Sequence, residues 1–387
     1  MEFRSGTAEE AGMSAAGGER VRELTAGWVV DGTTSATAAF VARRGVVVID
    51  EAYGVLGPEA YAPPLERDSI FPLASVTKPI TATCVMALVE DGLLGLNRPV
   101  QDYIPEFKGE GKDGVLVHHL LTHTSGIVEE HLGSFLEPIS GDGKFPECEA
   151  NQHLKIHQDL FANYEAPLTM GPGEEMSYCN CNYTLLGEIV RRVSGRSLAE
   201  FAEERVFGPL RMKDSYYIIP EEAKAQVVRR PSDVPFGRII DESSLGRPSA
   251  AGGLLSSARD IAIFAQMFLN GGTYGERRVL SGPTVAAMTR NQIVGIGANA
   301  FGEIHAEANW EYGWNIFAGD NWKCFPGTRM SPEAFNHPGA GGVFMWVDPT
   351  YDLVGVYFAV TLSLVDGVSG RTNSDLFVNA VTAAVLD

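Results

Sequence analysis

Two side chains with the chemistry of a nucleophile and its activator, Ser75 and Lys78, stand three residues apart in the segment FPLASVTKPITATCVMALVEDGLL, residues 71–94. The extended start of this segment gives way to an apolar helical run, so the spacing places both side chains on one face of a first helical turn. The helix N-terminus and the ammonium both stabilise negative charge that develops on a serine oxygen. The pattern suits acyl transfer, although a short S-x-x-K pattern also arises by chance from a capping serine and a surface lysine.

Two further segments carry polar residues at positions suited to the same site. Tyr178 and Asn180 form Y-x-N just before an apolar helical run, and NHPGAGGVFMWV (336–347) places His337 and Gly339 at the entrance to a strand. Glycine at that point permits close approach of another backbone segment.

These motifs, taken in order, resemble those of the β-lactamase-like serine hydrolases: class C β-lactamases, D-stereospecific peptidases and family VIII carboxylesterases. The resemblance extends over nearly the whole chain, because family-like blocks also occur at 38–54, LNRPVQDYIPEF (96–107), HHLLTHTSGI (118–127) and AAGGLLSSARDIAIFAQMFLNGG (250–272). It implies that Ser75 is the nucleophile, that Lys78 is its ammonium partner, and that Tyr178 acts first as general base and then as acid to the leaving group.

The resemblance also implies the remaining parts of the site. Asn180 would orient the lysine and the substrate, and the backbone N–H groups of Ser75 and Ala340 would hold the oxyanion. His337 and Gly339 would line the substrate site. Here the chain departs from β-lactamases, whose third motif is K-T-G: it reads H-P-G, with a titratable imidazole in place of a fixed cation. His337 either touches substrate or packs at the strand end.

This departure favours a carboxylesterase that hydrolyses short-acyl or aryl esters through an acyl-enzyme on Ser75, without a cofactor. The alternatives with the same machinery are a β-lactamase, a D-aminopeptidase or another amidase. A non-catalytic scaffold is the alternative from another class, and the intact polar set argues against it. The lipase-type G-x-S-x-G motif does not occur, so an α/β-hydrolase is not supported.

The order of predicted elements indicates an α+β fold of the β-lactamase and penicillin-binding-protein type, with an antiparallel sheet flanked by helices and an inserted, mostly helical domain. We expect residues 1–74 and 337–387 to form a discontinuous α/β sheet domain and residues 75–336 a helical domain with the active-site loops. Apolar periodicity predicts helices at 15–31, 79–94, 183–193, 197–206, 258–271, 283–290 and 371–387, a hairpin at 38–54, two strands within 341–360, and irregular loops at 133–175, 228–252 and 292–336.

The net charge of −19 makes nucleic acid and anionic membranes poor partners. We expect a small-molecule ester as the partner and a monomer or homodimer. The first residues lack the apolar run of a secretory signal, and residues 353–365 are too short to span a bilayer, so a cytoplasmic location is expected.

Several residues suggest metal or thiol chemistry. His119 with His123 and His153 with His157 have an i, i+4 spacing without the glutamate of H-E-x-x-H, so we expect structural hydrogen bonds and no metal. The five cysteines do not form a disulfide framework, and Cys179 and Cys181, which flank Asn180, are expected to fill space. A group of aromatic residues either lines an acyl or alcohol pocket or belongs to the core: Trp310, Tyr312, Trp314, Phe317 and Trp322.

Overall fold

The computed structural model describes residues 1–129, 131–132, 164, 166–234, 248–300, 303–316, 327–362 and 373–387. Six residues considered above lie outside this part of the chain: Cys148, His153, His157, Phe317, Trp322 and Cys324.

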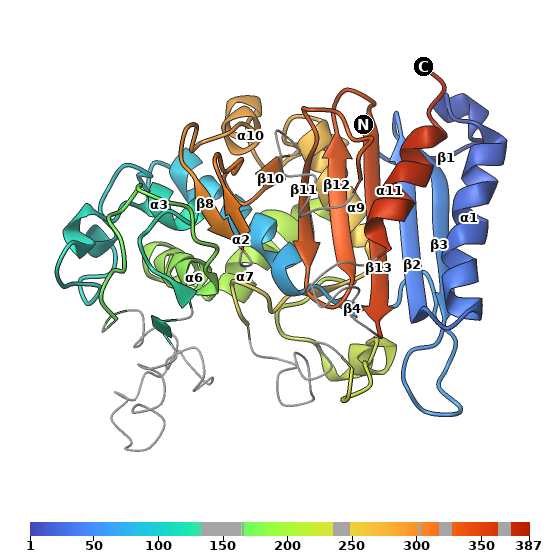
Figure 1. The fold of residues 1–387 in the computed structure, drawn as a ribbon, viewed down its shortest axis with the longest axis horizontal. Helices are drawn as coiled ribbons and strands as arrows, with labels where there is room; N and C mark the ends of the chain where they lie inside the picture. Colours follow the sequence, from blue (N-terminus) through green and yellow to red (C-terminus); the bar gives the residue numbers. More distant parts are fainter. Residues whose placement is uncertain are drawn as a thin grey trace.

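A mixed sheet built from both ends of the chain organises the fold (Figure 1). Neighbouring strands are antiparallel, except that β1 runs parallel to β3. In the described residues the strand order is β1 (Arg4–Ser5), β3 (Val46–Gly54), β2 (Thr34–Arg43), β13 (Leu353–Thr361), β12 (Val343–Asp348), β11 (Phe335–Gly339) and β10 (Asn315–Ile316). The predicted hairpin and the two predicted C-terminal strands are therefore confirmed.

The turn of the hairpin shows how the local sequence selects this structure. Arg44 and Gly45 have φ of 52° and 73°. Two consecutive positive φ values are the mark of a type I′ turn, whose twist matches that of the flanking strands.

Helices cover both faces of the sheet because its strands are apolar on both sides. Ala39 and Val41 of β2 pack with α1 (Ala15–Val30) and α11 (Ser374–Ala383), whereas Phe40 and Ala42 belong to the core on the side of α9 (Ala258–Leu269). In Figure 1, α1 and α11 lie in front of the sheet and α9 lies behind it. Helices on two faces explain the nearly continuous apolar runs of β2 and β13.

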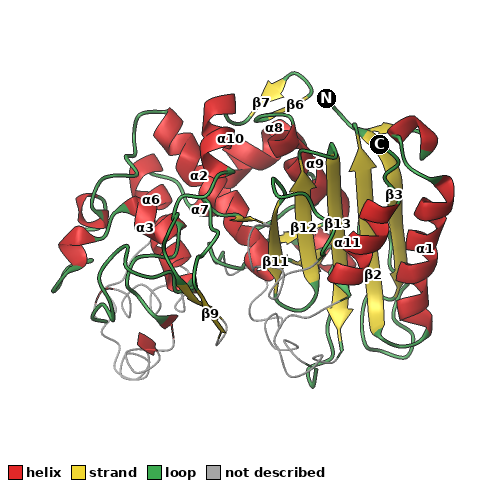
Figure 2. Cartoon of the chain, turned by 45° about the horizontal axis from the view of Figure 1, so that its top comes forward, coloured by secondary structure: helices red, strands yellow, loops and turns green. Residues whose placement is uncertain are grey.

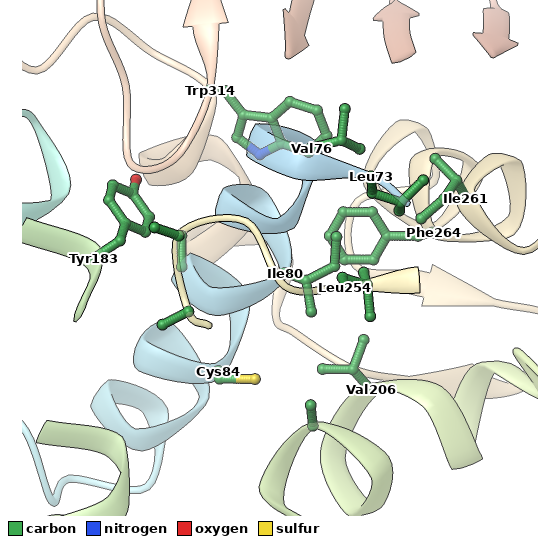
Figure 3. Close-up of a cluster of buried hydrophobic side chains, with 14 of the residues drawn as sticks. Leu73, Val76, Ile80, Cys84, Tyr183, Val206, Leu254, Ile261, Phe264 and Trp314 are labelled. Atoms are coloured by element: carbon green, nitrogen blue, oxygen red, sulfur yellow. The ribbon is translucent and has the colours of Figure 1, made fainter. Parts of the chain in front are cut away.

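Helix α2 (Thr77–Glu90) lies between the sheet and α6 (Asn180–Ser194), and it is almost completely buried (Figures 1 and 2). Its residues Ile80 and Cys84 pack among side chains from α9 and from the strand ends, including Leu254 and Phe264 (Figure 3). A helix that is apolar on all sides is expected in such a position. Because α2 carries Lys78, this packing fixes the lysine relative to the sheet.

The remaining helices confirm the expected helical middle of the chain. They are α3 (Val117–Leu121), α7 (Leu198–Ala202), which continues as a π-helical turn over Glu203–Phe207, α8 (Gly208–Leu210) and α10 (Gly282–Met288). The short strands are β4 (Phe71–Pro72) with β5 (Leu255–Ser256), β6 (Thr273–Tyr274) with β7 (Arg277–Arg278), and β8 (Ala298–Ala300) with β9 (Glu303–His305). No helix in the described part of the chain is long and apolar enough to cross a membrane.

Segment 292–336 was predicted to be irregular, and this prediction is wrong in part. It contains β8, β9 and β10, and β11 begins within it at Phe335. Strands of two or three residues give too little alternation to be recognised in a sequence. The proposed domain boundaries, 1–74 with 337–387 and 75–336, stay a prediction.

Candidate active site

Ser75 lies in a tight turn (Ala74–Val76) between β4 and α2. Ala74 has φ of +44°, in the left-handed region that non-glycine residues rarely adopt. The N–H of Leu73 donates to the carbonyl of Leu254 at 2.9 Å, which holds the strand before the turn. Ala74 and Val76 are buried, whereas Ser75 remains partly exposed. The strained turn thus presents the serine hydroxyl at the surface of an otherwise buried segment.

Lys78 is completely buried, and its ammonium has three acceptors. Its Nζ lies 3.1 Å from Ser75 Oγ, 2.7 Å from Asn180 Oδ1 and 2.9 Å from the carbonyl oxygen of Ala251. Burial lowers the pKa of Lys78 to about 7, against an opposing attraction from Glu129. At neutral pH the lysine is therefore close to half deprotonated and lies within reach of the serine proton.

Tyr178 also contacts the serine side chain. A hydrogen bond joins its phenol to the Ser75 side chain, and Lys78 Nζ lies 4.8 Å from the centre of its ring. Burial raises the pKa of Tyr178 well above its usual value, despite the hydrogen bond from Ser75. The neutral phenol is therefore the favoured form of Tyr178, and its role as base or acid stays a prediction.

Asn180 is the first residue of α6, and Glu129 fixes its orientation. Its Nδ2 donates to Glu129 Oε1 at 3.0 Å, and its backbone N–H donates to the other carboxylate oxygen. The amide oxygen must then face Lys78, so the assignment of the amide follows from its partners. The sequence analysis did not identify Glu129, because it lies 51 positions from Asn180 and no local motif joins the two residues.

The third motif reaches the serine through the backbone. A Cβ on Gly339 would lie 2.3 Å from the carbonyl oxygen of Leu73, so only glycine allows β11 to approach the strand before Ser75 this closely. Ala340 follows directly and is partly exposed. This approach brings the Ala340 backbone to the same end of α2 as the nucleophile.

His337 is buried, with 1% of its surface exposed, and it is uncharged. Its Nδ1 lies 2.7 Å from the carbonyl oxygen of Pro338, and its Nε2 has no partner among the described residues. Burial, together with repulsion from Lys78, lowers the pKa of His337 to about 3. This position therefore does not supply the fixed cation that lysine provides in a K-T-G motif, and contact with substrate stays a prediction.

His123 and Trp310 surround the tyrosine. The centre of the His123 ring lies 4.5 Å from that of Tyr178, and its Nδ1 accepts the N–H of Cys179 at 3.1 Å. Trp310 lies edge-on to Tyr178, with ring centres 5.7 Å apart, whereas Trp314 belongs to the core (Figure 3). The sequence left open whether these aromatic residues line a pocket or belong to the core. Trp310 lies at the site, whereas Trp314 belongs to the core.

The polar loop HTSGI (123–127) adjoins Tyr178 through His123, and side-chain hydrogen bonds hold it. The hydroxyl of Thr124 lies 2.8 Å from that of Thr122, and Ser125 Oγ donates to Asn182 Oδ1 at 2.7 Å. His119, one of the possible metal ligands, uses Nδ1 to accept the N–H of Leu116 at 3.1 Å. In the described part of the chain, the residues whose ligand atoms lie close enough to hold an ion are Glu129, Cys179 and Cys181.

Comparison with known proteins identifies the family. The sequence model of the Beta-lactamase family matches residues 19–377, which is most of the chain. The chain belongs to the beta-lactamase family. This confirms the resemblance drawn from the motifs, and the chain is a hydrolase of this family's β-lactamase and esterase type.

The relatives of this beta-lactamase-family chain include esterases and peptidases. Esterase EstB of Burkholderia gladioli is 29% identical over 331 residues, which cover 80% of this chain and 79% of the esterase. A putative D-alanyl-D-alanine carboxypeptidase of Salmonella agona is 25% identical over 364 residues, which cover 84% of this chain and 78% of the relative. A crystal structure of a family VIII carboxylesterase superposes with a TM-score of 0.76 at 23% identity and covers 96% of this chain and 98% of that one. The predicted fold is thereby confirmed, with a mixed rather than a purely antiparallel sheet.

Proposed function

We propose that this protein is a serine carboxylesterase that hydrolyses short-acyl or aryl esters through an acyl-enzyme on Ser75. The observation that carries the proposal is the contact of a partly exposed serine with a buried lysine whose pKa is about 7, beside an uncharged His337. The similarity to esterase EstB supports the same substrate class.

In the acylation step, the neutral amine of Lys78 removes the hydroxyl proton as Ser75 Oγ attacks the ester carbonyl carbon. The backbone N–H groups of Ser75 and Ala340 stabilise the oxyanion of the tetrahedral intermediate. Asn180 keeps the amine directed at the serine, because its amide oxygen is held at 2.7 Å from Nζ. The intermediate then collapses, the bond to the alcohol oxygen breaks, and the acyl group stays on the serine.

Tyr178 serves the leaving group in this scheme. Its phenol donates a proton to the departing alkoxide and recovers one from the Lys78 ammonium, which restores the neutral amine. The sequence led us to expect that Tyr178 begins as the base, but burial favours its protonated form and the neutral form of Lys78. In deacylation a water molecule attacks the acyl carbon, its proton passes to the same pair, and Ser75 regains its hydroxyl.

The test is hydrolysis of p-nitrophenyl butyrate and of a chromogenic cephalosporin, side by side, by the native protein and by Ser75→Ala. We expect efficient cleavage of the ester, poor cleavage of the cephalosporin and no activity of the variant above background. A better rate on the cephalosporin would show that the substrate class is wrong. Full activity of Ser75→Ala would refute the mechanism.

A D-alanyl-D-alanine carboxypeptidase is the second candidate, because the relative from Salmonella agona carries that name. Release of D-alanine from a D-alanyl-D-alanine peptide at a rate comparable to ester cleavage would favour it. Covalent labelling by a fluorophosphonate tests the non-catalytic alternative, since a scaffold without an activated serine forms no adduct on Ser75.

A further inference from the structure

Two thiols and a carboxylate lie close together beside Asn180, the partner of Lys78. Neither the motifs nor the proposed mechanism uses the thiols. Cys179 and Cys181 flank Asn180 at the start of α6, and their sulfur atoms and a Glu129 oxygen all lie within 4.8 Å of one another. In a tetrahedral zinc site, bonds of about 2.3 Å to sulfur and about 2.1 Å to oxygen place ligand atoms about 3.5–3.8 Å apart. Small side-chain rotations would therefore bring the three atoms to ligand positions.

The chemistry of the group fits a soft divalent cation. A hydrogen bond joins the two thiols, and Cys179 is completely buried, whereas Cys181 and Glu129 are partly exposed and give an ion access. Two cysteine sulfurs and a carboxylate oxygen are ligand types by which proteins bind Zn²⁺.

We propose that Glu129, Cys179 and Cys181 form a binding site for a thiophilic divalent cation, such as Zn²⁺, and that its occupancy inhibits the hydrolase. On binding, each thiol releases one proton to solvent and each thiolate forms one bond to the ion. A Glu129 oxygen supplies the third bond, and a water molecule supplies the fourth. No oxidant or reductant is needed.

Inhibition is expected because Glu129 would bind the ion and also orients Asn180 in the active site. This part of the proposal rests on the proposed function. The same carboxylate accepts both hydrogen bonds that orient Asn180, and Asn180 in turn holds Lys78 Nζ at 2.7 Å. An ion bound to Glu129 withdraws a carboxylate oxygen from Asn180. The amide loses its fixed orientation, and the lysine loses the partner that directs it to Ser75.

Binding is tested without any assay of activity. The full-length, reduced protein is titrated with Cd²⁺, whose bonds to thiolates give an ultraviolet charge-transfer band, and Zn²⁺ is then added as a competitor. We expect one equivalent of Cd²⁺ to produce the band and Zn²⁺ to remove it. Cys181→Ala should lack this band, whereas Cys84→Ala, which removes a buried thiol of α2 outside the cluster, should keep it. Cys148 and Cys324 are present in both variants, so the difference between the variants isolates the proposed site.

Inhibition is tested next with p-nitrophenyl butyrate. Zn²⁺ should inhibit the native protein and Cys84→Ala, and a chelator should restore the rate. Cys181→Ala should need at least about 100-fold more Zn²⁺, because loss of a direct ligand weakens binding at least as much as loss of a residue that supports a ligand. A Cd²⁺ band that persists in Cys181→Ala refutes the site, and equal Zn²⁺ sensitivity of the two variants refutes the inhibition. A protein that shows the band but cleaves no ester refutes the proposed function and leaves the cation site standing.

Discussion

Replacement of Lys78 by methionine should abolish activity without destabilising the fold. Lys78 is completely buried, and its pKa falls from 10.5 in the unfolded chain to about 7 in the folded one. Each step of one in pKa corresponds to about 1.4 kcal/mol, so burial of this amine costs on the order of 4 kcal/mol at pH 7. Methionine has a similar length and does not incur this cost.

The substitution also removes favourable contacts. Without the ammonium, the carbonyl of Ala251 and the amide oxygen of Asn180 lose their donor, at about 1–3 kcal/mol each. The two effects nearly cancel, and we expect the free energy of unfolding of Lys78→Met at pH 7 to lie within about 2 kcal/mol of the native value. A stability penalty imposed by a catalytic group is common in active sites.

The pH dependence separates the two effects more sharply. Because the folded-state pKa of Lys78 lies below its unfolded value, the unfolded chain binds the proton more tightly, and stability rises as the pH increases from about 7 towards 10.5. Between pH 6 and pH 9 the native protein should gain about 2.5 kcal/mol relative to Lys78→Met. Urea unfolding followed by circular dichroism at the two pH values measures this difference.

Ser75→Ala is the matched control for this experiment, since it is equally inactive but keeps the lysine and should keep the native pH slope. If Lys78→Met showed the same slope as the native protein, the lysine would not change its proton affinity on folding. The assignment of its neutral form as the base would then fail.

Three further changes test the groups around this centre. Glu129→Gln should lower kcat by about 10- to 100-fold, because an amide cannot accept both hydrogen bonds from Asn180. The acid limb of the pH–rate profile should also shift to lower pH, because Lys78 loses a negative neighbour. Arg230→Met should lower kcat by about 10-fold with little change in KM, because this guanidinium donates to the carbonyl of Gly341 and to that of Ala359 in β13, and so holds the turn that would carry the second oxyanion donor. Arg229→Met, which breaks only an exposed ion pair, should match the native rate. Asp260→Asn should raise the urea midpoint at pH 8 but not at pH 4. Burial raises the pKa of Asp260 to about 7, so the stability that its protonated form contributes is lost as the pH rises from about 4 to 7.

The elements that the sequence predicted well are those with a strong local signal. The hairpin at 38–54 has a turn sequence suited to positive φ, and the segment at 79–94 has a continuous apolar run. The observed helix α2 begins at Thr77 and ends at Glu90, so Lys78 lies inside it, and Gly92 with φ of +72° follows its end. Boundaries differ by a few residues because capping and packing, rather than periodicity, set them.

The site residues also divide into those that a local motif predicts and those that only the fold brings together. Ser75, Lys78 and Asn180 stand in short motifs, and the structure brings them within hydrogen-bond distance. Glu129 was missed because its contact with Asn180 depends on how two segments that are far apart in the sequence meet in the fold. The protonation states of Lys78 and Tyr178 were also beyond the sequence, since both pKa values depend on burial, which is a property of the whole fold.

The charge state of the site links these observations to substrate choice. A carboxylate on the substrate needs a cation, and His337, at the position of the lysine in K-T-G, is neutral because burial holds its pKa near 3. A substrate carboxylate would then be attracted to Lys78, the cation near the serine, and its negative charge would raise the pKa of Lys78. That shift would protonate the amine, the form that cannot accept the serine proton. A neutral ester would leave the pKa of Lys78 near 7 and the proposed base available. We therefore expect the third motif and the buried lysine together to select against anionic substrates.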